Sequence, residues 1–94
     1  MTFWLKCSIE TGMFPGEYAV LMETCDAGTI SLFAPEDKIR VQEKLMQVEL
    51  LKDSNGAGAL VRLPAQPFEI TSQIVKVSQN SLVKSDDSQQ LGNT

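Results

Sequence analysis

The chain contains no histidine, and this absence excludes several kinds of chemistry. Without an imidazole there is no Ser-His-Asp or Cys-His catalytic arrangement, no histidine metal ligand and no side chain whose ordinary pKa lies near neutral pH. The sequence also lacks an apolar run that approaches the roughly 18 residues of a membrane-spanning helix. Its start has neither the basic region nor the apolar run of a secretory signal peptide. We therefore expect a cytoplasmic protein.

Cationic side chains are few. The 94 residues include 8 Lys and Arg against 12 Asp and Glu, a formal net charge of −4. Binding to nucleic acid or to an anionic membrane surface needs clustered Lys and Arg. Here Lys38, Arg40 and Lys44 are the cations that lie close together in the sequence. We expect neither nucleic acid nor a membrane to be a partner.

Cysteine is also scarce, because Cys7 and Cys25 are too few for a disulfide framework and suit a reducing compartment. If Ile9 lies opposite Met22 in the first hairpin, Cys7 lies opposite Thr24. Cys25 then points to the other face of the sheet, so the two sulfurs cannot be bridged. We expect Cys7 to be a small buried apolar side chain. Cys25, at the end of a strand, is the candidate for a reactive thiol.

What the chain does contain is the composition of one globular domain, with 43% apolar and 21% charged residues. Apolar and polar residues alternate along several short stretches that end at Gly, Pro, Asn or Asp. This pattern is typical of β-strands joined by turns. We predict strands over the ranges 3–12, 18–25, 29–34, 45–52, 59–63 and 74–77, and a turn or short strand at 81–83.

The segment from 35 to 52 has two interpretations, a continuous helix or a helical turn followed by a strand. Pro35 and the acidic residues after it suit the first turn of a helix. On a helical wheel, however, the apolar side chains of this segment do not form one stripe. We therefore predict a short helical turn near 35–40 and a strand over 45–52, in which Leu45 and Leu51 occupy outward positions.

These elements predict an all-β fold. We expect a small antiparallel barrel of five to six strands, SH3-like as first choice and of the oligonucleotide/oligosaccharide-binding (OB) type as second. The range 1–83 forms this single domain. The polar range 84–94 is predicted to be a disordered tail. An analogy of fold carries no function by itself.

The aromatic residues give the candidate site. By alternation, Trp4 and Phe33 lie off the inward phase of their strands, and Phe14 lies in a Phe-Pro-Gly turn. Large aromatic side chains outside the core supply anchors of protein–protein interfaces. In the alternative interpretation, a loop or a chain end covers Trp4 and Phe33, and Phe14 plugs the mouth of the barrel. The interface interpretation predicts that Trp4 and Phe33 are accessible to solvent.

Other motifs are explained by turns. The Asp-Ala-Gly-Thr sequence at 26–29 resembles the Asp-Thr-Gly loop of aspartic proteases, which act through two carboxylates. Ala27 stands where that family has Thr or Ser, and a hairpin turn accounts for the motif. The Gly-Ala-Gly sequence at 56–58 lacks the third Gly, the Lys and the helix of a phosphate-binding loop. We expect no metal and no cofactor.

Together these observations favour a non-catalytic protein-interaction module, a subunit or an assembly factor, that binds a protein partner and is a monomer or a homodimer. One alternative is a homo-oligomeric domain of structural role. The other is an enzyme that uses the thiol of Cys25 or carboxylates.

Overall fold

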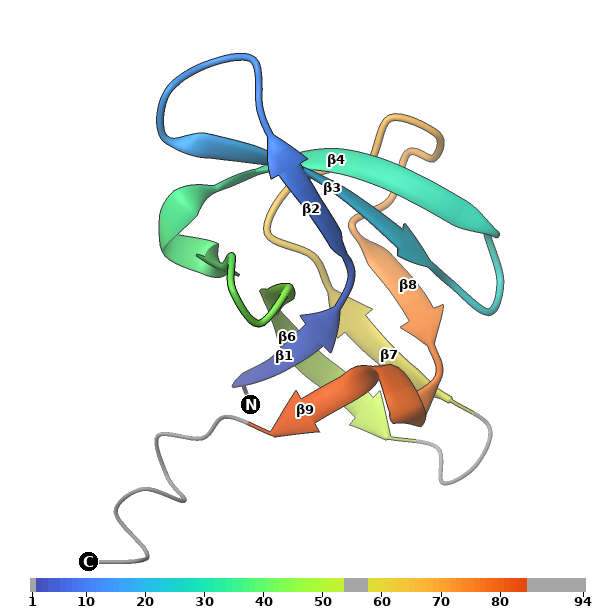
Figure 1. Cartoon of the computed structure of the whole chain (residues 1–94). Helices are drawn as coiled ribbons and strands as arrows, with labels where there is room; N and C mark the ends of the chain where they lie inside the picture. The colour runs from blue at the N-terminus through green and yellow to red at the C-terminus, as the bar shows by residue number, and fades with distance from the viewer. Residues whose placement is uncertain (1, 54–57, 85–94) are drawn as a thin grey trace, which may run out of the picture.

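The computed structural model of the chain describes residues 2–53 and 58–84 (Figure 1). These residues form β-strands and two short 3-10 helices, which confirms the all-β class. The elements are, in order, β1 (Thr2–Lys6), β2 (Ser8–Thr11), β3 (Glu17–Glu23), β4 (Thr29–Pro35), η1 (Glu36–Lys38), β5 (Ile39–Arg40), β6 (Leu45–Asp53), β7 (Ala59–Arg62), β8 (Ile74–Val77), η2 (Gln79–Ser81) and β9 (Leu82–Lys84).

The strands form two antiparallel sheets. The larger sheet has the order β8-β7-β6-β1-β9, with β5 paired to the start of β6, and the smaller sheet has the order β2-β3-β4. β1 and β2 are one bent strand that is interrupted at Cys7, where the chain passes from the larger sheet to the smaller. The strand pairings of the described residues do not close the two sheets into the predicted barrel.

The core lies between the two sheets, the smaller of which is at the top of Figure 1. Both sheets contribute the inward half of each alternating strand, as the sequence pattern predicts. Full burial of one such side chain contributes about 1.5–3 kcal/mol. The buried cluster consists of Leu5, Val20, Met22, Ile30, Leu32, Ala34, Met46, Val48, Val61, Leu63, Val75 and Val77.

The register of the first hairpin differs from the predicted one. Ile9 pairs with Val20 and not with Met22. The reason is that the β2–β3 loop is centred earlier in the sequence than the predicted register requires, because the Gly12 N–H donates to the carbonyl of Glu17 at 3.3 Å. A shift of two residues keeps every side chain on its predicted face, because side chains alternate with a period of two.

The segment between β4 and β6 follows the second of its two interpretations. η1 and β5 occupy the predicted helical turn near 35–40, and β6 covers the predicted strand over 45–52. The Gly-Ala-Gly sequence at 56–58 falls partly outside the described residues, and the predicted tail at 84–94 does so almost entirely. Within the described part of the chain, no helix has the length and apolarity needed to cross a membrane.

Candidate functional site

Trp4 is buried, and the prediction that solvent reaches it is wrong. The side chain lies on the outer face of the larger sheet, out of phase with Leu5, but 8% of its surface is exposed. The guanidinium carbon of Arg40 in β5 lies 4.3 Å from the centroid of the Trp4 ring. This cation–π contact covers the ring. Trp4 is therefore not available as an interface anchor.

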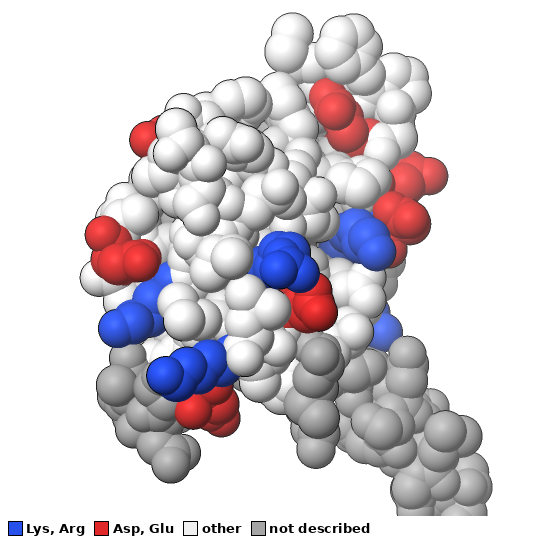
Figure 2. Space-filling model, turned by 180° about the vertical axis from the view of Figure 1, so that it is seen from behind, with Lys and Arg blue, Asp and Glu red and all other residues white. Residues whose placement is uncertain are grey.

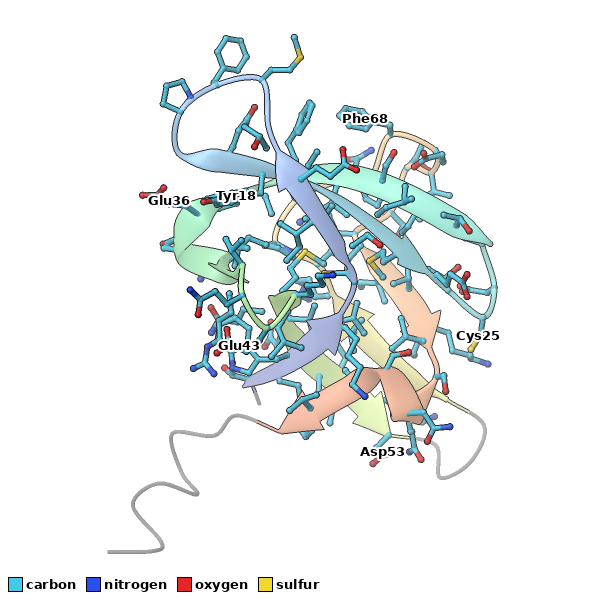
Figure 3. All side chains as sticks on the ribbon, in the orientation of Figure 1. Tyr18, Cys25, Glu36, Glu43, Asp53 and Phe68 are labelled. Atoms are coloured by element: carbon cyan, nitrogen blue, oxygen red, sulfur yellow. The ribbon has the colours of Figure 1, made fainter. Side chains whose placement is uncertain are left out.

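Phe33 lies in β4 on the outer face of the smaller sheet and is half-buried. The ring of Phe68 packs edge-on against it, with 5.3 Å between the centroids and 81° between the planes. Phe68 itself is 65% exposed and lies beside β4 in Figure 3. Sequence reasoning missed this pair, because it joins a loop to a strand far away along the chain and no local pattern predicts such a contact.

Hydrogen bonds hold the loop that carries Phe68 against the edge of β4. The Phe68 N–H donates to the carbonyl of Ser31 at 2.9 Å. In return, the N–H and the hydroxyl of Ser31 donate to the two carboxylate oxygens of Glu69 at 2.7 and 2.6 Å. These bonds, the hydroxyl first, lower the pKa of Glu69 because they stabilise its charged form. The loop therefore occupies the edge of β4 at Ser31.

Phe14 and Met13 lie in the β2–β3 loop, which rises above the smaller sheet in Figure 1. Their side chains are 67% and 74% exposed. Phe14 therefore does not fold back onto the core. The neighbouring Gly16 has a φ of +87°, a left-handed conformation that favours glycine and lets the loop turn tightly.

Leu21 adds a further exposed apolar side chain on the outer face of the smaller sheet. It lines a shallow hollow of about 250 Å³ together with Ser8, Glu10, Ala19, Val20 and Ser31. Phe33 lies directly opposite Ala19 in the register of β3 and β4, so it shares this face with the hollow. We use the term apolar face for the side chains on this sheet and its two adjoining loops, namely Met13, Phe14, Leu21, Phe33 and Phe68.

A second hollow, of about 430 Å³, lies where the bent first strand leaves the larger sheet. Its lining is mixed and consists of Lys6, Cys7, Ser8, Leu21, Met22, Glu23, Thr29 and Ser81. Burial raises the pKa of the Cys7 thiol to about 12. The thiol therefore stays protonated near neutral pH and is a poor nucleophile.

Cys25 is exposed and, like Cys7, is a free thiol. The sequence predicts it at the end of a strand, but β3 ends at Glu23, and Cys25 lies in the turn between β3 and β4, at the right of Figure 3. Its N–H donates to the carbonyl of Lys76 at 2.7 Å, and the carboxylate of Asp26 accepts from the Lys76 N–H at 3.4 Å. These bonds attach the turn to β8. A reactive role for Cys25 stays a prediction.

In the described ranges, no group of three or more Cys, Asp and Glu side chains is arranged to hold a metal ion. No protein-family model, curated protein or solved structure matches the chain.

Proposed function

We propose that the protein is a non-catalytic protein-interaction module that acts in the cytoplasm and binds a protein partner through the apolar face. The observation that carries this proposal is the exposure of Phe14, Leu21 and Phe68, which is 67%, 49% and 65%. Exposed apolar side chains that gather on one side of a small domain mark interaction surfaces. Aromatic side chains such as Phe14 and Phe68 present a large contact area with few rotatable bonds.

For the fold, we propose a nearly closed barrel of the SH3-like type, with a nearly closed barrel of the OB type as the alternative. The support is the first strand, which bends at Cys7 and belongs to both sheets. Strands that pass from one sheet to the other through a bend form the corners of small β-barrels and orthogonal sandwiches.

Tagged co-purification from the native cell tests the functional proposal. A Phe14→Ala/Phe68→Ala variant truncates two largely exposed side chains and is expected to stay folded. The matched control, Val41→Ala/Ile74→Ala, removes side chains of 46% and 41% exposure beside the larger sheet. We expect one stoichiometric protein to be captured by the wild type and the control and lost from the Phe14→Ala/Phe68→Ala variant. If all three chains capture the same proteins, the apolar face is not the binding surface.

A further inference from the structure

Positive charge is missing from the part of the chain that carries the apolar face. Between Lys6 and Lys38 the sequence contains no Lys and no Arg, but it contains six carboxylates: Glu10, Glu17, Glu23, Asp26, Glu36 and Asp37. The range 63–75, which includes the loop that carries Phe68, adds Glu69 and again no cation.

In the folded molecule, this gap coincides with the smaller sheet, and Lys6 lies at its border, in the hollow that it lines with Leu21 and Glu23. The range 7–37 contains the complete smaller sheet and its hairpin loops, whereas Lys and Arg lie on the larger sheet and its connections. Figure 2, seen from behind, shows Lys and Arg over the middle and lower parts of the surface and only uncharged and acidic residues in the upper part. On the larger sheet, Arg62 and Glu49 form an ion pair at 2.9 Å.

Carboxylates stand directly beside the apolar centre of this face. Glu10 lines the 250 Å³ hollow with Leu21 and Ala19. The register places Glu10 opposite Ala19 and Leu21 opposite Ser8, so Glu10 and Leu21 are diagonal neighbours on the same face. Glu23 follows Leu21 on the outward phase of β3. A side chain that packs on Leu21 therefore has a carboxylate on either side of it.

We propose, resting on the function proposed above, that the partner of the apolar face is a protein segment with large apolar side chains flanked by Lys or Arg. Interfaces place opposite charges around an apolar centre, because complementary potentials speed association and like charges disfavour wrong partners. The apolar side chains of the segment pack on Leu21, Phe33 and Phe68. Its cations lie beside Glu10 and Glu23.

A second copy of this chain fits the same surface poorly. A two-fold symmetric dimer uses the same patch on both subunits and would bring the carboxylates of the two copies together. Nucleic acid is disfavoured for the same reason, because its phosphates would face Glu10 and Glu23. The charge of the face therefore selects a basic protein segment from among these occupants.

Two peptides of about 14 residues, roughly four helical turns, test the proposal. One consists of Leu and Lys, and the other carries Glu in place of every Lys. Each is titrated into the isotope-labelled full chain, and backbone amide resonances are followed by NMR. We expect the Leu/Lys peptide to shift Ala19, Leu21 and Ser31 with saturation at one peptide per chain. We expect the Leu/Glu peptide to bind at least about tenfold more weakly.

Charge-reversal variants locate the effect. Glu10→Lys places a cation beside the hollow, whereas Glu43→Lys makes the same change in the exposed turn between β5 and β6 (Figure 3). We expect Glu10→Lys to weaken binding of the Leu/Lys peptide by about tenfold and Glu43→Lys by less than about twofold. Raising the ionic strength from about 0.05 M to about 0.3 M is expected to weaken wild-type binding as well.

Three results would overturn the proposal. The first is equal affinity for the two peptides. The second is an equal loss of affinity for the Leu/Lys peptide in Glu10→Lys and Glu43→Lys. The third is the absence of chemical-shift changes at residues of the smaller sheet. A self-associating wild type that becomes monomeric in Phe14→Ala/Phe68→Ala would instead identify a second copy as the occupant. The co-purification does not depend on the charge of the captured protein. If the apolar face captures a protein but binds both peptides equally, the proposed function stands and the inference of a basic partner is wrong.

Discussion

Cys7 and Cys25 show how two residues of one type acquire different chemistry. Cys25 is exposed in the turn between β3 and β4, whereas Cys7 is half-buried at the bend of the first strand. Burial disfavours the thiolate because it removes the charged form from water, and it raises the pKa of Cys7 from 9.0 to about 12. In the unfolded chain the Cys7 thiol returns to its ordinary pKa.

This difference predicts a pH dependence of stability. Between pH 9 and pH 12 the unfolded chain loses the Cys7 proton while the folded chain retains it, so the free energy of unfolding falls as the pH rises. Below pH 9 the contribution is fully present. Denaturant titrations at a series of pH values measure this effect. We expect the free energy of unfolding to fall less steeply with pH in Cys7→Ala than in the wild type, and equally steeply in Cys25→Ala and the wild type. Equal slopes for wild type and Cys7→Ala would contradict the pKa shift.

Arg40 determines the environment of the sole tryptophan. We expect Arg40→Ala to expose Trp4, shifting its fluorescence to longer wavelength and increasing quenching by iodide. The free energy of unfolding is expected to fall by about 0.5–2 kcal/mol, because both the cation–π contact and the packing of the arginine stem are lost. Arg62→Ala is the matched control, since Arg62 pairs with Glu49 at the surface and is expected to cost less than about 1 kcal/mol. Unchanged Trp4 fluorescence in Arg40→Ala would show that other residues bury the ring.

At the scale of the element, the sequence predicts the strands but not the residues that pack over their outer faces. The predicted ranges 29–34 and 74–77 correspond to Thr29–Pro35 and Ile74–Val77, because alternation and the flanking turn residues define them locally. The two-residue strand β5 is too short for any periodic pattern, yet it carries Arg40, whose guanidinium lies over the Trp4 ring. Phe33 is likewise partly covered by Phe68, a residue that lies far from it in the sequence.

The loop on β4 depends on one carboxylate, so we expect it to loosen in acid. The pKa of Glu69 is lowered, so its bonds to Ser31 are present above the ordinary carboxyl pKa of 4.5 and are lost as the pH falls through the lowered value. Glu69→Gln is expected to speed hydrogen exchange at the amides of Ser31 and Phe68 already at neutral pH. Gln66→Glu, in the same loop, serves as the control that leaves the Ser31 bonds intact. Unaltered exchange in Glu69→Gln would show that the backbone bond from Phe68 holds the loop alone.

At the scale of the whole molecule, charge and apolar exposure divide along the same line as the two sheets. The sequence identified Phe14 and Phe33 as candidates for the apolar face, because aromatic residues off the core phase can be recognised locally. It did not identify Phe68, whose place on the face depends on how its loop packs against β4. The cation-free range 7–37 runs through the whole smaller sheet and could have predicted which side of the molecule is acidic.

The pairing of β1 with both β6 and β9 has a consequence for how the chain is made. The ribosome releases β1 before either of these neighbours, because one comes from the middle of the sequence and the other from residues 82–84. Strand pairs that are distant in sequence form late, and an unpaired edge attracts other chains. During synthesis, one edge of β1 therefore stays unpaired until almost the whole domain has emerged. In this interval the nascent chain is most exposed to aggregation and most in need of a chaperone.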